Sequence, residues 1–576
     1  MTTSHRELGF VRTYVFSTDH KTIGIQFLFT SLVMLLVGGL LAMLIRWQLG
    51  WPGQPLPFME KLAPNGMPGG VMVPEYYNML FTMHGSIMIF FAIIPLLVGV
   101  FGNYLIPLKI GAGDMAFPRL NMVSYWLLPP AILTVCAGFF LEGGAAAAGW
   151  TAYAPLSTTL GPGQLCWIIG VLLLGTSSIM GSVNYVTTVI NLRAPGMGFF
   201  RLPLSIWALF ITAVIIVMAT PVLASALILL LLDSTIGTSF FLPAGLIIDG
   251  VLQPNSGGQV LLWQHLFWFY SHPAVYIMIL PAMGIASEIL PVFASKPLFG
   301  YHSMVYALMA IAVLGFMVWA HHMFASGMNP TLGTSFMVST MVIAVPSAIK
   351  TFNWLGTLWR GSIRFTTPML HAIAFVSMFV IGGLTGIFAA AAPVDLYLHD
   401  TYFIVGHLHY VLFGGSLFGI FAGITFWFPK MFGRMLNETL GKIHFVLTFI
   451  FFNAVMFPMF ILGVAGMPRR IYDYTQYAHL AHVGGLNRMM SVSAFCLGLA
   501  QLLFIVNFFW SLWRGRGAGE NPWQANTLEW MTPSPPPHGN FATTPTVYHG
   551  PYEYSVPGRS KDWMPQTEPA AIPSHS

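Results

Sequence analysis

The sequence predicts an all-α integral membrane protein with about twelve transmembrane helices and both termini in the cytoplasm. Of its 576 residues, 56% are hydrophobic and only 7% are charged, whereas about a quarter of the residues of a soluble domain are charged. Long apolar runs recur along the chain, and most reach the roughly 20 residues that a helix needs to cross a bilayer. Lysine and arginine gather in alternate connections between these runs. The net charge of +5 therefore bears on topology, and no nucleic-acid partner is expected.

Twelve apolar runs give the expected spans in chain order. They cover residues 24–46, 79–106, 122–141, 165–192, 204–231, 260–291, 300–324, 334–356, 367–390, 403–428, 442–464 and 489–513. Polar residues precede the first run, which has full spanning length, so we interpret it as a span and not as a cleavable signal. Residues 1–515 are expected to form one twelve-span domain. Residues 516–576 are rich in Pro, Gly, Thr and Ser, which predicts an extended tail on the cytoplasmic side.

The distribution of positive charge sets the expected orientation. With twelve spans, both ends of the chain and the even-numbered connections share one side. That side holds most of the lysines and arginines, and the opposite side holds only Arg46, Lys61, Arg469, Arg470 and Arg488. The positive-inside rule therefore places both termini in the cytoplasm.

Six histidines lie in these apolar spans: His84, His272, His321, His322, His407 and His409. In the expected topology, five of them fall in the outer third of the membrane and His272 lies somewhat deeper. A single intramembrane histidine can simply bond a neighbouring helix. Because six histidines from four spans converge on one layer, we interpret them as ligands of a shared redox metal site. Imidazole suits iron, copper and zinc.

The spacing of His407 and His409 indicates two separate metals. Residues two apart on a helix point about 200° apart, since each residue advances by about 100°. One ring therefore faces each side of the helix. His84 and His409 can hold one iron from two sides, and His407 can hold a second iron that faces a third metal.

The remaining three histidines form a candidate site for that third metal. His321 and His322 are adjacent, so both can reach one ion at a helix end, and His272 completes a three-histidine set with an open position. Tyr276 lies four residues after His272 and thus on the same helical face. A tyrosine at this spacing usually packs in a core, but beside a metal its phenol can donate a proton and an electron.

Over about residues 15–515 the chain resembles subunit I of the haem–copper oxidases, the catalytic subunit of cytochrome c oxidase. Six motifs carry this resemblance. They are residues 17–21 (STDHK), 82–85 (TMHG), 113–119 (GDMAFPR), 319–324 (WAHHMF), 399–403 (HDTYF) and 466–470 (GMPRR). The resemblance implies reduction of dioxygen to water with outward proton pumping. It implies two A-type haems, one low-spin and one high-spin, together with one copper and a magnesium ion. It also implies a copper-carrying subunit II, further subunits, a cytochrome c-type donor and a bacterial cytoplasmic (inner) membrane.

The resemblance assigns a role to each candidate ligand. His84 and His409 resemble the axial ligands of the low-spin haem, and His407 the proximal ligand of the oxygen-binding haem. His272, His321 and His322 resemble the copper ligands, with the residue matching Tyr276 covalently bonded to that matching His272. Three arginines resemble haem contacts: Arg469 and Arg470 at the propionates, and Arg46 near a formyl group. His399 and Asp400 resemble magnesium ligands, although without the resemblance they could simply cap a loop.

Two proton paths are implied from the inner side. Lys350 is the one lysine buried within a span, and a snorkelling side chain is its simpler explanation. With Ser347, Ser287 and Glu288 it resembles the first path, which leads to Tyr276. The second path would begin at Asp114, for which a solvated loop carboxylate is the simpler explanation. Its expected lining is Asn103, Asn121, Ser177, Ser178 and Asn184.

One departure affects the end of the second path. Many members of the family carry a glutamate two residues after the first copper ligand, and here that position is Ala274. Tyr270 and Ser271 resemble a subgroup in which these hydroxyls take the place of the carboxylate. A quinol oxidase and a haem-free proton-coupled transporter stay open as alternatives to an oxidase that takes electrons from cytochrome c.

Overall fold

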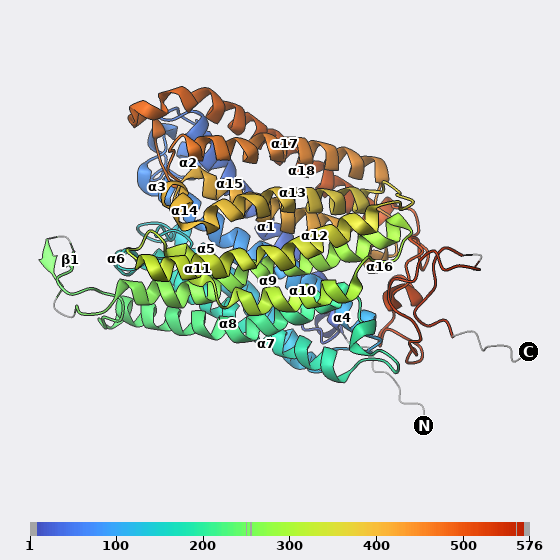
Figure 1. Cartoon of the computed structure of the whole chain (residues 1–576). Coiled ribbons are helices and arrows are strands. Elements are labelled where there is room, and N and C mark those ends of the chain that lie inside the picture. Colours follow the sequence, from blue (N-terminus) through green and yellow to red (C-terminus); the bar gives the residue numbers. More distant parts are fainter. Residues whose placement is uncertain (1–8, 249, 254–255, 560, 570–576) are drawn as a thin grey trace, which may run out of the picture.

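The computed structural model describes residues 9–248, 250–253, 256–559 and 561–569. The chain forms a bundle of helices that run roughly along one direction, with loops and short helices at both ends (Figure 1). The long helices are α1 (His20–Gly50), α5 (Pro118–Ala137), α7 (Pro162–Asn191), α8 (Leu204–Thr235), α9 (Val260–Ala294), α13 (Thr367–Ala390), α17 (Glu438–Val464) and α18 (Gly484–Arg514).

Three further spans are each built from consecutive helical pieces. The second span, Pro74–Ile110, combines α3 (Pro74–Ser86), two π-helical stretches (Ile87–Ile93 and Pro95–Val100) and α4 (Phe101–Ile110). The eighth combines α11 (Pro330–Val342) and α12 (Ala344–Leu358), and the tenth combines α15 (Tyr402–Val411), a π-helical stretch (Leu412–Leu417) and α16 (Phe418–Phe432).

The connections contain only short elements. They are α2 (Met59–Leu62), α6 (Leu156–Thr159), α14 (Ala392–Leu398), 3-10 turns that include Ala478–Val483, and one antiparallel hairpin of β1 (Ile247–Ile248) and β2 (Val251–Leu252). The hairpin projects beyond the helix ends on the side opposite the tail (Figure 1).

Within the described residues, eleven helical segments are long and apolar enough to cross a membrane. The predicted all-α membrane fold is therefore confirmed, while the seventh span differs from expectation. In place of a continuous helix over 300–324, α10 (Tyr301–Gly315) ends early and a 3-10 turn, Trp319–Met323, follows. The break turns the chain at the point where His321 and His322 must both face α9. Side chains one residue apart on a straight α-helix would point about 100° apart.

Three central spans are much more deeply buried than the other spans. The most apolar windows of α9, of Pro74–Ile110 and of Tyr402–Phe432 are 100%, 89% and 83% buried, whereas the other long spans reach at most 44%. Outer helices keep one face for lipid, so they bury less than half of their residues. The three central spans carry four of the six histidines, so the candidate metal layer lies in the middle of the bundle.

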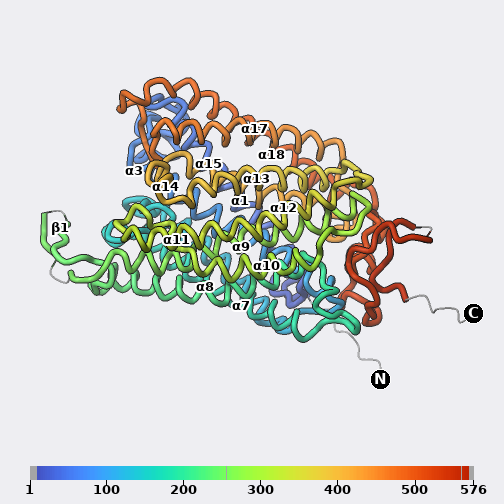
Figure 2. The backbone as a smooth tube through the Cα atoms, in the orientation of Figure 1, coloured from blue at the N-terminus to red at the C-terminus, as the bar shows by residue number. Residues whose placement is uncertain are grey.

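The chain beyond residue 515 lies across one end of the bundle, shown in red in Figure 2. In its described part the longest helix is the 3-10 turn η11 (Leu528–Met531). Trp523, Leu528 and Trp530 are nevertheless buried, and the indole of Trp523 donates to the carbonyl of Phe426 at 2.8 Å. The expected extended character is thus combined with extensive burial, which the polar composition of the tail did not indicate. The boundary at 515/516 stays a prediction.

The start of α1 and the described part of the tail lie at this same end of the bundle. Asn540 of the tail bonds to His20 and Lys21 at the start of α1. This agrees with an even number of crossings, and the assignment of that side to the cytoplasm stays a prediction from the charge distribution.

Candidate metal centre and proton paths

His84 of α3 and His409 of α15 face each other across the centre of the bundle. Their rings are nearly parallel, with an interplanar angle of 6° and centroids 6.3 Å apart. In each residue Nδ1 bonds a backbone carbonyl, that of Gly38 at 2.9 Å for His84 and that of Val405 at 2.8 Å for His409. Nε2 is therefore free for a metal, because the bond at Nδ1 fixes the tautomer. The spacing leaves room for one metal ion between the rings, as the sequence predicts.

His407 points away from this pair, toward α13. Its Nδ1 lies 2.9 Å from the carbonyl of Gly382 and 3.2 Å from the hydroxyl of Thr385. The two histidines of the Gly-His-Leu-His motif thus use different neighbours and face different sides of α15. This is the arrangement expected if each binds a separate metal.

The other three histidines form one compact cluster. Ligand atoms of His272, His321 and His322 all lie within 4.8 Å of one another. His272 Nδ1 is 3.2 Å from His322 Nε2, which is 3.1 Å from His321 Nε2. Three nitrogens this close and nearly buried would need a shared cation or protons between them. The cluster therefore fits one copper ion, for which imidazole is a suitable ligand.

Neighbouring side chains hold the cluster in place. The indole of Trp268 stacks on the His322 ring at 3.8 Å between centroids with an angle of 12°, and Thr340 bonds His321 Nδ1 at 3.0 Å. Trp268 was not among the predicted site residues, although its position four residues before His272 places it on the same face of α9.

Tyr276 contacts the cluster through His272. Its phenol oxygen lies 3.0 Å from His272 Nε2, and the two rings are 5.0 Å apart. His272 thus offers Nδ1 to the cluster and Nε2 to the phenol. The predicted pairing of His272 and Tyr276 is therefore close enough for proton exchange, while a covalent bond between them stays a prediction.

The three arginines expected near haem lie around the histidine layer. Arg46 bonds Ser491 and the carbonyl of Asn487, the latter at 2.7 Å, and its Nη1 is buried without a hydrogen-bond partner among the described residues. The Nε of Arg469 is likewise buried without a partner among the described residues, whereas its Nη2 pairs with Asp400. Burial lowers the pKa of Arg470 to about 10. Buried guanidinium donors without acceptors fit an anionic or carbonyl-bearing group such as haem.

His399 and Asp400 lie close together in the connection before α15, but both have protein partners. His399 Nδ1 bonds Asp395 at 3.2 Å, which raises the pKa of His399, and Asp400 pairs with Arg469. Asp395 was missed from the sequence; it lies one helical turn before His399. Magnesium at this pair stays a prediction.

Lys350 of α12 is fully buried, and its Nζ has no hydrogen-bond partner among the described residues. The ammonium lies over the ring of Trp354 at 5.6 Å, and the indole of Trp354 donates to Ser287 at 2.8 Å. Ser347 bonds its own helix, at the carbonyl of Ile343. Glu288 is engaged elsewhere, in an ion pair with Lys109 at 3.0 Å. The structure thus joins Lys350 to Ser287 through Trp354, whereas Glu288, the next residue along α9, contacts Lys109 and Ser205.

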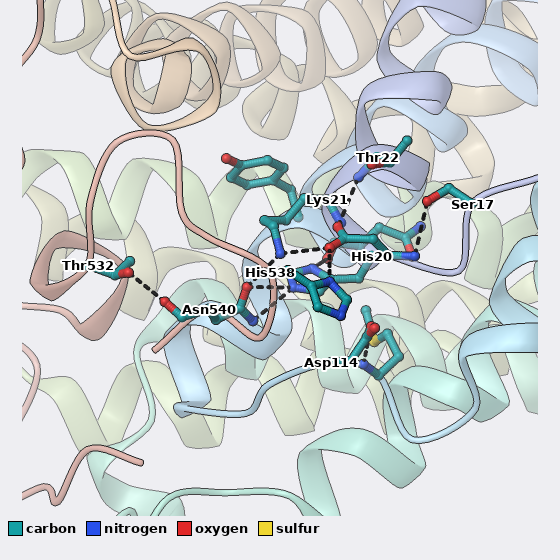
Figure 3. A network of polar contacts seen from close by, with 12 residues as sticks. Ser17, His20, Lys21, Thr22, Asp114, Thr532, His538 and Asn540 are labelled. Carbon is teal, nitrogen blue, oxygen red and sulfur yellow. Dashed lines mark hydrogen bonds and ion pairs between the residues drawn. The ribbon is translucent and has the colours of Figure 1, made fainter. Parts of the chain in front are cut away.

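Asp114 lies in the loop between α4 and α5, beside the start of α1 and the tail (Figure 3). Its carboxylate accepts from the backbone of Met115 at 2.7 Å, and burial raises its pKa to about 6. His20 bridges the carbonyl of Asn103 at 2.8 Å and the side chain of Asn540 at 3.0 Å. Sequence reasoning noted the residues 17–21 motif without giving His20 a role, and it gave no signal for Asn540.

The expected lining of the second path leads from this loop into the bundle. Asn184 accepts from the backbone of Phe117 at 2.9 Å, and Asn103 donates to Tyr185 at 2.8 Å. Both side-chain polar atoms of Asn121 are buried without partners among the described residues. Ser177 donates to the carbonyl of Ser124, while Ser178 is only partly buried on α7. Unpartnered buried amides of this kind are sites where bound water is expected.

Tyr270 and Ser271 lie near the far end of this proposed path. Both are buried on α9, and the hydroxyl of Ser271 has no hydrogen-bond partner among the described residues. The described contacts do not join them to Asp114, so their relay role stays a prediction.

Comparison with known proteins agrees with this geometry. The family model described as "Cytochrome C and Quinol oxidase polypeptide I" matches residues 22–496. Cytochrome c oxidase subunit 1 of Synechocystis sp. is 48% identical over 96% of this chain and 95% of that protein. Alternative cytochrome c oxidase subunit 1 of Bradyrhizobium diazoefficiens is 45% identical over 96% and 93%. A solved heme-copper terminal oxidase dimer shares the fold, with a TM-score of 0.72 and 20% identity over 87% of this chain and 85% of that chain.

Fold, histidine geometry and matches together define a membrane-embedded catalytic subunit of the terminal oxidases, which uses haem and copper and works with other subunits. The chain belongs to the family of cytochrome c and quinol oxidase polypeptide I. The predictions of an oxidase subunit I, of an oxidoreductase and of a multi-pass membrane protein are confirmed. The haem-free transporter that the sequence left open is excluded.

Proposed function

We propose that this chain reduces dioxygen to water with electrons from a cytochrome c-type donor, received through a copper-carrying subunit II, and that it pumps protons outward. We further propose two A-type haems, one low-spin at His84 and His409 and one high-spin at His407, and a bacterial inner membrane. Magnesium at His399 and Asp400 belongs to the same proposal. Haem iron and copper, when bound, supply the oxygen-binding and electron-transfer chemistry.

One observation carries this proposal: a three-histidine cluster with a tyrosine phenol 3.0 Å from His272 Nε2. His272, His321 and His322 would hold the copper, since their ligand atoms all lie within 4.8 Å of one another. Tyr276 can pass its proton outward to the reacting oxygen and regain one from the inner side, where Lys350 lies. Lys350 lies in a low-dielectric setting, where a lysine can gain and lose its proton, which suits a relay.

The proposed electron donor, cytochrome c, has one specific alternative, a quinol. The relatives at 44–48% identity are named as cytochrome c oxidase subunits, which favours cytochrome c, whereas the family description includes quinol oxidases. The purified complex should show two haems and one copper in this subunit by absorption spectroscopy and metal analysis. Steady-state oxygen uptake with reduced cytochrome c, compared with a quinol, then decides the donor. Oxidation of the quinol alone would overturn the cytochrome c assignment.

A further inference from the structure

Lys109, at the inner end of α4, is a fully buried lysine between two carboxylates. Its Nζ lies 3.0 Å from Glu288 Oε2 on α9 and 3.0 Å from Glu529 Oε1 in the tail. All three side chains are at most 2% exposed. An ammonium and two carboxylates removed from water this completely are costly unless they pair closely. The three residues, here called the tail triad, therefore form one electrostatic unit.

The carboxylates of the tail triad have different surroundings. Glu288 Oε2 accepts from the hydroxyl of Ser205 at 2.6 Å, at the N-terminus of α8, where the helix dipole favours negative charge. Glu529 Oε1 accepts from the indole of Trp427 at 3.2 Å, whereas its Oε2 is buried without a partner among the described residues. The triad thus contains one well-bonded carboxylate and one with a free acceptor.

Other charged and titratable groups near the triad form no ion pair with it among the described residues. Lys430 attracts the Glu529 carboxylate at longer range, but its ammonium donates to backbone carbonyls, most closely that of Thr532 at 2.6 Å. Tyr552 and Tyr554 of the tail are phenols, and burial raises the pKa of each well above its usual value, so they add no charge. Within the triad itself, two carboxylates around one ammonium leave an excess of one negative charge.

This excess charge lies one residue along α9 from the first proton path. Glu288 directly follows Ser287, whose hydroxyl receives the indole hydrogen bond of Trp354, and the ring of Trp354 faces Lys350. A buried negative charge attracts cations, and a proton is the one cation that needs no room in a site this closed. Glu529 supplies the charge that makes the balance negative.

We propose that the tail triad is a proton-attracting site at the inner end of the first path, and that Glu529 is a positioning residue that the tail contributes to it. The inference rests on the proposed role of Lys350. It gives the chain after residue 515 a function in proton uptake, beyond covering the helix ends.

Charge-balanced variants of the purified oxidase test this. Glu529→Gln removes the excess charge, so reduction of the oxygen-binding haem in stopped-flow measurements should slow by about tenfold. Lys109→Met with Glu529→Gln leaves Glu288 as the single charge and restores the original balance, so the rate should recover. A purely structural role predicts the reverse, because the double variant loses more contacts than the single one.

Glu520→Gln is the matched control, since Glu520 is an exposed carboxylate of the same tail. The rates can be compared only in variants that retain both haem spectra. If Glu529→Gln alone loses haem, the rate of the double variant is compared with that of the wild type. A wild-type rate in Glu529→Gln, or a double variant slower than the single one, would overturn the inference. If the Lys350→Met variant reduces its oxygen-binding haem at the wild-type rate, the first path itself is misassigned. That result would contradict the proposed function and not the role of the tail triad alone.

Discussion

The half of the molecule that holds the histidines and the half beside the tail, the predicted outer and inner halves, are built in different ways. In the outer half, each haem-ligand candidate bonds a carbonyl of its own or an adjacent helix, as His409 does with Val405 and His407 with Gly382. In the inner half, the polar groups around Asp114 and Lys109 are completed by Asn540 and Glu529, more than 400 residues away in the chain. A metal site needs fixed ligand directions, which rigid helices supply. Proton uptake needs polar groups at a surface, which a late tail can supply.

The largest expected effect falls on the outer half. His409→Ala should abolish the low-spin haem signal and leave the other haem largely in place, because His407 faces the opposite side of α15. The reduced-minus-oxidised absorption spectrum of the purified protein measures this. Normal binding of both haems in this variant would show that the ligand assignment is wrong.

Tyr276→Phe comes next, and it separates binding from chemistry within the same half. Both haems should remain bound, while oxygen uptake falls by roughly 10²- to 10⁴-fold, the usual contribution of a positioned proton donor. Mass spectrometry of the active protein should find His272 and Tyr276 crosslinked. Unlinked peptides from fully active enzyme would contradict the covalent pairing.

Lys350→Met tests the connection between the halves. Electrons that enter a low-dielectric site need compensating protons, so reduction of the oxygen-binding haem should slow by about 100-fold. Stopped-flow spectroscopy under anaerobic conditions reports this step. Lys296→Met is a suitable control, since Lys296 donates to the backbone carbonyls of Gly356 and Trp359.

Asp114→Asn should act on pumping and leave the first haem reduction nearly intact. Burial raises the pKa of Asp114 to about 6, so its carboxyl is protonated below that pH and ionised above it. Proton release from reconstituted vesicles should slow by about tenfold in the variant. In the wild type, the rate of proton release should change with pH around a midpoint near 6. This change should be absent in the variant. Persistence of that dependence in Asp114→Asn would assign it to another group.

The smallest expected effect concerns Tyr270 and Ser271. Changing them together to Phe and Ala should reduce pumping a few-fold, in the same direction as Asp114→Asn, if their hydroxyls replace the missing carboxylate. Ala274→Glu in that background should recover part of the proton flow. Full pumping in the double variant, measured in the same vesicles, would mean that bound water alone carries the protons.

These halves also differ in how well the sequence predicts them. Helical periodicity, which is a local property, predicts that His84 and His409 face each other. It also predicts that His407 points to a different side of its helix. The break between α10 and the turn at His321 could not be predicted, because hydropathy continues across it while the geometry changes. The burial of Glu529 was missed for a different reason. Its partners Lys109 and Glu288 lie on distant helices, and a polar tail with one carboxylate carries no periodic signal.

The π-helical stretches that follow His84 and His409 have a consequence for how this protein can change. Each wide turn accommodates a residue more than an α-helix of the same rise, since its hydrogen bonds span five residues and not four. The stretch Leu412–Leu417 lies between α15 and α16. The directions in which the side chains of α15 point are therefore set independently of those of α16. The ligand-bearing segment and the inner segment of one span can each keep its own register. Insertions or deletions near residue 414 would be absorbed there, whereas the same change within Tyr402–Val411 would turn both histidines away from their metals.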